Sequence, residues 1–222
     1  MAQNPRKTKK TDADKVWHKK GQPSVAKKTR QPKQRFFIVC EGQTEKLYFE
    51  SFPVKSAHIE AVDLGTTPKN IVAHARKYGA GYDQIWCVFD MDFNLEKANQ
   101  KAEFDNAVFT AKGKLHCAYS NDSFELWFVL HYQSMTAAEH RSRYNEILSD
   151  VWGITYDEIG KTKAFARTIY AKLQTDTRAH QEMALHRAKQ LQTEHSDKPP
   201  HQQNPVTTVF ELVAELLQWC EA

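Results

Sequence analysis

The sequence lacks any apolar run long enough to cross a membrane, and no apolar segment lies near its start. A transmembrane helix needs about 20 consecutive apolar residues, and the core of a secretory signal needs about 7 to 15. We therefore expect a soluble protein that is neither exported nor bound to a membrane. The cytoplasm is its default compartment.

Cysteine is scarce, and the four cysteines, at positions 40, 87, 117 and 220, are widely spaced. The sequence contains neither a CxxC nor an HExxH motif, which are typical spacings of zinc ligands. The first three cysteines lie in apolar, strand-like runs. This pattern favours buried, reduced thiols over disulfides or a zinc site.

Positive charge is concentrated at the start of the chain. Residues 1–35 contain 12 of the 31 Lys and Arg residues and only two acids, Asp12 and Asp14, for a net charge of +10. The other 187 residues have 19 basic and 25 acidic side chains, for a net charge of −6. Residues 1–34 also have few large apolar groups and cannot form a core. We predict that they form a disordered basic tail.

A basic tail favours polyanions because each phosphate that it neutralises releases counterions. We therefore expect the tail to contact nucleic acid, whether RNA or DNA. The candidate contacts are Lys9, Lys10, Lys19, Lys20, Lys27, Lys28 and Arg30. A tail that only increases solubility, with no specific partner, is the alternative.

From Arg35 onward, apolar strand-like runs alternate with amphipathic helical segments. Strands are predicted over residues 35–40, 58–64, 84–90 and 114–120, and helices over 44–52, 68–79 and 95–112. This alternation predicts an α/β fold in which helices cover both faces of a mostly parallel sheet. The core would span residues 35–133.

Beyond Tyr132 the pattern predicts no further strand. Helices are expected over residues 136–150, 158–173, 176–195 and 205–220. We interpret residues 134–222 as a helical extension that packs on the core.

Acidic residues follow three of the predicted strands. Glu41 follows the first strand, Asp90 and Asp92 end the third, and Glu125 begins the helical segment after the fourth. Ligands of open α/β sheets bind where the carboxyl ends of the strands meet, so these acids should converge. Clustered carboxylates repel one another unless a cation compensates them, and their oxygens suit Mg²⁺ or Mn²⁺.

Each acid also has a simpler explanation. Glu41 can be a turn residue, and Asp90 and Asp92 can be loop or helix-capping residues. Glu125 stands three residues after Asp122, which fits a capping box at a helix start. However, alternate residues of an extended segment point the same way, so a DxD pair directs both carboxylates at one target. Four acids at three strand ends favour a common site.

Four segments resemble the RloB-like proteins: VCEGQTEKLYFESF, CVFDMDFN, SNDSFELWFVLHY and NPVTTVFELVAELL. The likeness covers about residues 35–217, and the EGxTExxYF, FDxD and SNxxFExWxxxH blocks occur in family order. The core of that family is similar to the TOPRIM fold of topoisomerases, primases and OLD-type nucleases. The resemblance therefore implies a TOPRIM-like core that binds a divalent metal.

The resemblance also assigns roles to the acids. Glu41 takes the glutamate position of the TOPRIM pattern, as a general acid/base or metal ligand. Asp90 and Asp92 take the metal positions, and Glu125 is the additional acid of the third block. The polar residues implied around these acids are Thr44, Glu45, Ser120, Asn121, Asp122 and His131.

Two of these surrounding residues need comment. Family members usually have proline at the position of Asp122, so this chain adds an acid there and has a less rigid helix start. His131 lies six residues beyond Glu125, about one and two-thirds helical turns, so the two need not share a helix face. A structural role is favoured for His131.

The main functional hypothesis is a metal-dependent nuclease, a hydrolase of phosphodiester bonds. RloB-like proteins are associated with bacterial antiphage defence, and related TOPRIM effectors cleave nucleic acid. Analogy with those effectors places RNA, with tRNA as one candidate, slightly ahead of DNA. Partner proteins of a defence system and an oligomeric state are further expectations. The alternatives are a non-catalytic nucleic-acid-binding module and a sensor or assembly subunit.

Overall fold

The computed structural model describes residues 34–91, 99–111 and 113–220, which belong to one compact unit. The seven candidate contacts of the basic tail lie outside these residues, and so does Asp92. No helix of the described ranges is long and apolar enough to cross a membrane.

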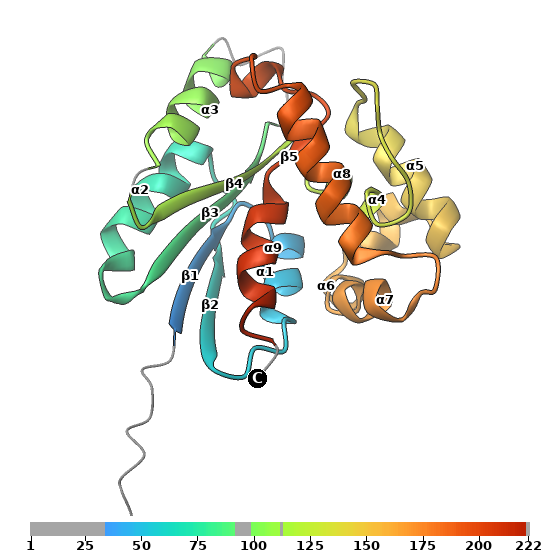
Figure 1. The fold of residues 1–222 in the computed structure, drawn as a ribbon, viewed down its shortest axis with the longest axis horizontal. Coiled ribbons are helices and arrows are strands. Elements are labelled where there is room, and N and C mark those ends of the chain that lie inside the picture. The colour runs from blue at the N-terminus through green and yellow to red at the C-terminus, as the bar shows by residue number, and fades with distance from the viewer. Residues whose placement is uncertain (1–33, 92–98, 112, 221–222) are drawn as a thin grey trace, which may run out of the picture. The chain divides into compact units, whose positions relative to one another are not determined.

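A five-stranded sheet forms the centre of the molecule, with the strand order β2-β1-β3-β4-β5 (Figure 1). The first four strands are parallel, and β5 pairs antiparallel with β4. The strands are β1 (Gln34–Cys40), β2 (Ala57–Asp63), β3 (Gln84–Asp90), β4 (Leu115–Asn121) and β5 (Val206–Thr207). The predicted α/β fold with a mostly parallel sheet is therefore confirmed.

Helices cover both faces of this sheet. In Figure 1, α2 (Pro68–Tyr78) and α3 (Gln100–Phe109) lie on one face, while α1 (Gln43–Glu50) and α9 (Val209–Leu217) lie on the other. β1 is accordingly buried without interruption from Phe36 to Cys40, as expected for a strand that is covered on both sides.

The remaining helices lie beyond β4 in the chain. They are α4 (Glu125–Val129), α5 (Arg141–Trp152), α6 (Lys163–Ala166), α7 (Ile169–Thr175) and α8 (Gln181–Glu194). Short helical turns occur at Gly79–Gly81, Tyr156–Gly160 and Pro200–Gln202. α4 contacts β4, β5, α5 and α8, so it connects the sheet to the later helices.

The prediction that no strand follows Tyr132 was wrong. Thr207 and Val206 pair with Ser120 and Asn121 at the end of β4. Two residues are too few to show the alternating pattern by which a strand is identified in a sequence. The helix predicted over 205–220 consequently begins at Val209.

The prediction of one helix over residues 158–173 was also wrong, because three separate helical elements cover this range. The segment Tyr156–Gly160 is a π-helical turn, and Gly160 packs so closely on Tyr156 that a Cβ there would lie 2.1 Å from the ring. Thr162 then accepts a hydrogen bond from the Phe165 N–H at 3.3 Å and begins a new helix, α6. A side-chain cap of this kind marks the start of a helix, and α7 begins separately at Ile169.

The other helix ends differ from the predicted ends. α5 begins at Arg141 rather than at residue 136, because His140 caps it and accepts a hydrogen bond from the Ser142 N–H at 3.3 Å. It ends at Gly153, whose φ of 65° is the left-handed conformation that glycine adopts readily. α3 lies inside the predicted range 95–112, and α8 begins at Gln181 rather than at residue 176.

All four cysteines are free thiols. Cys40 and Cys87 are buried in β1 and β3, whereas Cys117 and Cys220 are only partly buried. The expectation of a buried thiol is thus too strong for Cys117, which lies on β4 and is only partly covered.

An aromatic core joins α1 to α4. The indole N–H of Trp127 donates to the Tyr48 hydroxyl at 2.9 Å. The Tyr48 ring also packs edge-on against Phe124 and Phe128, with centroids 5.9 and 5.4 Å apart. Edge-to-face pairs at such distances are favourable. This packing fixes α1 against α4, and so fixes the acids at the start of each helix.

Candidate active site

The order in which successive strands join the sheet reverses after β2. β2 lies on one side of β1 and β3 on the other, so the carboxyl ends of β1 and β3 form a topological switch point. Crevices at such points are the usual ligand sites of open α/β sheets. The predicted acids Glu41 and Asp90 lie at these two strand ends.

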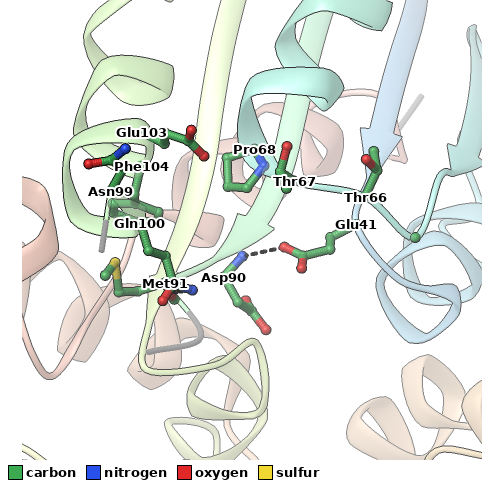
Figure 2. Close-up of a pocket in the computed structure, with 11 residues that line it drawn as sticks. Glu41, Thr66, Thr67, Pro68, Asp90, Met91, Asn99, Gln100, Glu103 and Phe104 are labelled. Carbon is green, nitrogen blue, oxygen red and sulfur yellow. Dashed lines mark hydrogen bonds between the residues drawn. The ribbon is translucent and has the colours of Figure 1, made fainter. Parts of the chain in front are cut away.

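Hydrogen bonds hold Glu41 and Asp90 together. The Glu41 N–H donates to the Val88 carbonyl at 2.9 Å and continues the pairing of β1 with β3. The Asp90 N–H donates to Glu41 Oε2 at 3.2 Å, as Figure 2 shows. The Glu41 side chain is therefore fixed by the backbone of the strand that carries Asp90.

We define the acid pocket as the hollow of about 200 Å³ at this edge of the sheet. The acids Glu41, Asp90 and Glu125 line it, as the strand-end argument predicted. The other charged and polar side chains that line it are Gln43, Thr44, Glu45, Arg141 and Lys161. Of the predicted surrounding residues, Thr44 and Glu45 thus belong to the pocket itself.

Glu45 is more central than the sequence suggested. It lies in the first turn of α1 and is only 7% exposed. Burial, with smaller contributions from the nearby Glu125 and Glu41, raises the pKa of its carboxyl group to about 8, even though Arg141 acts in the opposite direction. Gly42 makes room for this carboxylate, because a Cβ there would lie 2.7 Å from Glu45 Oε2.

Asp90 is the second acid in an unfavourable environment. Burial raises its pKa well above the usual range, and the charges of Glu45, Glu125 and Glu41 add to this effect. Its Oδ1 atom is buried and has no hydrogen-bond partner in the part of the chain that the structure describes. A buried acceptor without a partner is rare in native proteins, so it marks a place where a ligand can bind.

Arg141 supplies positive charge to the acid pocket, and no pattern in the sequence predicted it there. Its guanidinium lies 3.9 Å from Asp90 Oδ2 and 3.9 Å from Asp122 Oδ2. The Asp122 carboxylate also accepts a hydrogen bond from the Arg141 N–H at 2.9 Å, where α5 begins. Asp122 thus satisfies one of the first N–H groups of α5 and fixes Arg141 beside Asp90.

Glu125 begins α4 and is 7% exposed. The hydroxyl of Tyr156 donates to Glu125 Oε1 at 3.4 Å. Burial raises the Tyr156 pKa well above its usual value, with further contributions from Glu125, Glu45 and Asp90. Tyr156 therefore remains a neutral hydrogen-bond donor to the pocket.

Ser120 and Asn121 do not line the acid pocket. Ser120 Oγ lies 2.9 Å from the Thr207 hydroxyl, and the Asn121 amide donates to the carbonyls of Pro200 and His201 at 3.3 and 3.0 Å. Both side chains instead connect the end of β4 to β5 and to the turn that precedes it. The peptide bond between Asn121 and Asp122 is cis.

His131 is fully buried and does not line the acid pocket either. Its Nδ1 lies 2.9 Å from the Trp127 carbonyl, and its ring packs edge-on against the Trp127 indole. Burial lowers the pKa of His131 to about 4, so the ring is neutral at physiological pH. These contacts indicate that His131 is a structural residue of the core.

The acid pocket offers carboxylate oxygens, the type of donor that divalent cations prefer. Within residues 34–91, 99–111 and 113–220, no three His, Cys, Asp or Glu side chains form a group ready to hold a metal ion. Asp92, the second acid of the DxD pair, lies outside these residues. Carboxylate oxygens are the ligands that Mg²⁺ and Mn²⁺ prefer, and Asp90 Oδ1 is a buried carboxylate oxygen without a partner.

A larger pocket of about 750 Å³ shares Glu41 and Asp90 with the acid pocket. It lies between residues 65–68 at the start of α2 and residues 99–104 at the start of α3 (Figure 2). In the same view, the Asp90 carboxylate points away from Glu103 on α3. The two pockets therefore meet at Glu41 and Asp90.

Comparison with known proteins places the chain in a family. No curated protein and no solved structure matches it. The sequence profile of a family described as RloB-like protein matches residues 36–216, which include every described residue that lines the acid pocket. Because this match covers most of the chain, the protein belongs to the RloB-like protein family.

Proposed function

We propose that this protein is a divalent-metal-dependent nuclease with a TOPRIM-like core, acting as an antiphage defence effector. The observation that supports this most directly is the acid pocket, where four carboxyl groups from three strand ends face one small hollow. Burial, and after it the neighbouring acids, raise the pKa values of Asp90 and Glu45, so ionising these groups costs free energy that a bound cation would offset. Family resemblance alone favours RNA, including tRNA, over DNA.

Each residue of the pocket has a role in this proposal. Glu41, Asp90 and Glu125 would hold Mg²⁺ or Mn²⁺, together with Asp92. The bound cation would polarise the scissile phosphate and offset the charge that develops on it. Glu41 would transfer the proton, and its orientation is fixed by the Asp90 N–H. Arg141 would bind a phosphate oxygen, because its guanidinium already faces the pocket.

The charge distribution of the chain favours a second candidate, a non-catalytic nucleic-acid-binding module or sensor subunit. Residues 1–35 have a net charge of +10, and a basic segment binds phosphates without any catalytic centre. Deleting residues 1–34 should weaken nucleic-acid binding and reduce its salt dependence under both candidates. Only the nuclease hypothesis predicts that the protein without residues 1–34 still cleaves nucleic acid.

The test is cleavage of RNA and DNA in the presence of Mg²⁺ or Mn²⁺. Panels of labelled tRNA, single-stranded RNA and DNA are incubated with the wild type, Asp90→Asn and Asp105→Asn. Asp105 is the matched control, because it is partly buried but is paired with His201 at 2.6 Å and lies outside the acid pocket. Asp90→Asn should lower the cleavage rate by about a hundredfold or more, since a metal ligand contributes several kcal/mol.

The outcomes are separable if the fold of each variant is checked by circular dichroism. Cleavage that EDTA abolishes, that Asp90→Asn loses and that Asp105→Asn retains supports the proposal. If the wild type binds nucleic acid but cleaves none of the panel with either metal, the non-catalytic candidate replaces it.

A further inference from the structure

The π-helical turn Tyr156–Gly160 meets the acid pocket at two points. Tyr156, its first residue, is fully buried, and its hydroxyl donates to Glu125 Oε1 at 3.4 Å. Lys161, the residue that follows the turn, lines the acid pocket together with the acids. π-helical turns are rare and often occur at functional sites. One short element thus brings a tyrosine and a lysine to the same hollow.

Contacts on both sides fix the backbone of this turn. The Tyr156 N–H donates to the hydroxyl of Ser149 on α5 at 3.0 Å, so α5 holds the start of the turn. At the other end, Gly160 packs against the Tyr156 ring, and Thr162 caps the start of α6. Lys161 stands between these two fixed points. Its backbone is therefore held at the pocket while its side chain is exposed.

Lys161 and Arg141 are the two cationic residues among the described lining of the acid pocket, and they differ in their partners. The Arg141 guanidinium lies 3.9 Å from both Asp90 and Asp122. Lys161 has no hydrogen bond or ion pair with any residue that the structure describes, although four acids line the same hollow. An ammonium group has three donors and no acceptor. Those donors are available to an anion at the pocket.

A phosphate group is an anion that suits this place. The four acids alone would repel it. The proposed function places a divalent cation among them, and sites of Mg²⁺ are commonly completed by the phosphates of a substrate. A lysine that no acid holds is then a second source of positive charge for the same phosphate.

We propose that Lys161 binds an oxygen of the scissile phosphate and that Tyr156 positions Glu125 as a metal ligand. In the hydrolysis, a water oxygen bonds to phosphorus, the bond from phosphorus to the leaving oxygen breaks, and Glu41 passes one proton of the water to that oxygen. Lys161 keeps its protons and offsets the charge that develops on the phosphate. This inference deepens the proposed function and rests on it for the metal and the phosphate.

Metal affinity tests the positioning role of Tyr156 without any reaction. The Kd of Mn²⁺ is measured by calorimetry for the wild type, Tyr156→Phe and Tyr144→Phe, and circular dichroism checks each fold. Tyr156→Phe should raise the Kd about tenfold or more, because hydrogen bonds to metal ligands contribute that much to affinity. Tyr144→Phe is the matched control, since Tyr144 is also fully buried but its hydroxyl has no partner among the described residues.

Equal Kd values in the wild type and both variants would overturn the role of Tyr156. A wild type that binds no Mn²⁺ would overturn the proposed metal site and this role with it.

Binding of inorganic phosphate in millimolar Mg²⁺ tests Lys161. Lys161→Met should bind phosphate about tenfold more weakly than the wild type, because a hydrogen bond from a charged donor is lost, and Lys161→Arg should retain most of the affinity. Lys163→Met is the matched control, since Lys163 is equally exposed two residues later but does not line the acid pocket. A wild type that binds no phosphate, or a Lys161→Met variant that binds it equally well, would overturn this assignment.

Cleavage assays then separate the inference from the proposed function. Lys161→Met should cleave at least about tenfold more slowly than the wild type, with an unchanged Kd for Mn²⁺. If metal and phosphate binding depend on Tyr156 and Lys161 but no substrate is cleaved, the nuclease is refuted and both contacts stand. If Lys161→Met cleaves at the wild-type rate, the nuclease stands and the role of Lys161 is refuted.

Discussion

Two groups of buried polar side chains lie at the same edge of the sheet, and they differ in how their polar atoms are satisfied. At the end of β4, Ser120 and Asn121 have hydroxyl or carbonyl partners within 3.3 Å. At the ends of β1 and β3 and at the starts of α1 and α4, four acids line one hollow, and Asp90 Oδ1 has no partner among the described residues.

The difference indicates which group is structural. Satisfied, uncharged polar groups stabilise a fold modestly and fix its geometry. Clustered carboxylates raise one another's pKa and destabilise the fold unless something compensates them. Perturbed groups of that kind are typical of functional sites. We therefore assign structure to the end of β4 and function to the acid pocket, and the predictions below test this division.

The largest effect is expected for Arg141→Met, which removes positive charge beside Asp90. The pair is only partly buried, so removing its cation should cost less than a fully buried pair does, up to about 3 kcal/mol. The loss should be largest near pH 8 and smaller near pH 5, because Asp90 and Glu45 have raised pKa values and become neutral as the pH falls. Urea unfolding at both pH values in EDTA measures it.

Asn121→Ala is the comparison variant for the end of β4. It removes hydrogen bonds between neutral groups, so its cost should be the same at both pH values. A pH-independent loss for Arg141→Met would mean that this guanidinium does not compensate the acids.

The second prediction concerns stabilisation by metal. At a concentration of Mn²⁺ about 100 times the dissociation constant, binding to the folded state stabilises it by about 2.7 kcal/mol. For a protein of this size that corresponds to a rise in Tm of roughly 5 to 10 °C. Asp90→Asn should lose most of this rise, and Asp105→Asn should retain it. Equal rises in all three proteins would contradict a metal site at Asp90.

The sequence predicted the parts of the site that follow directly from strand ends. Glu41 and Asp90 adjoin apolar runs that could only be strands, and parallel strands bring such residues to one edge. Glu125 was found through the apolar helix that follows it. The first four strands, their parallel pairing and their coverage by helices also followed from the alternation of strands and helices, whereas the order of the strands in the sheet did not.

The parts that were missed depend on packing between distant segments. Arg141 enters the pocket because α5 packs on α4, and no local pattern encodes that contact. β5 has only two residues, and its partners are 87 and 85 positions earlier. Glu45 did have a signal, since it lies four residues after Glu41 in the first helical turn, on the side that faces the strand end.

The third prediction is a pH dependence that originates in Glu45. Its pKa is raised from 4.5 to about 8, so the folded state holds a proton that the unfolded state releases between these values. The stability from this group is therefore full below about pH 4.5 and is lost as the pH rises through about 8. Glu45→Gln removes that loss, because the amide is neutral at every pH.

In EDTA, Glu45→Gln should therefore be about as stable as the wild type near pH 4.5 and clearly more stable near pH 8.5. Denaturant unfolding of both proteins across this range gives the difference directly. A variant that is less stable than the wild type at pH 8.5 would show that the Glu45 carboxylate makes favourable contacts that outweigh its burial.

The smallest effect is expected for Ser120→Ala, at the end of β4. The substitution removes the one hydrogen bond between the hydroxyls of Ser120 and Thr207, which lie 2.9 Å apart, and leaves the Thr207 hydroxyl buried. It should cost about 1 kcal/mol at every pH, because neither group titrates. The rise in Tm with Mn²⁺ should equal that of the wild type, since Ser120 does not line the acid pocket. A reduced rise would mean that the pairing of β4 with β5 also positions the acids, and the division between a structural and a functional group would then fail.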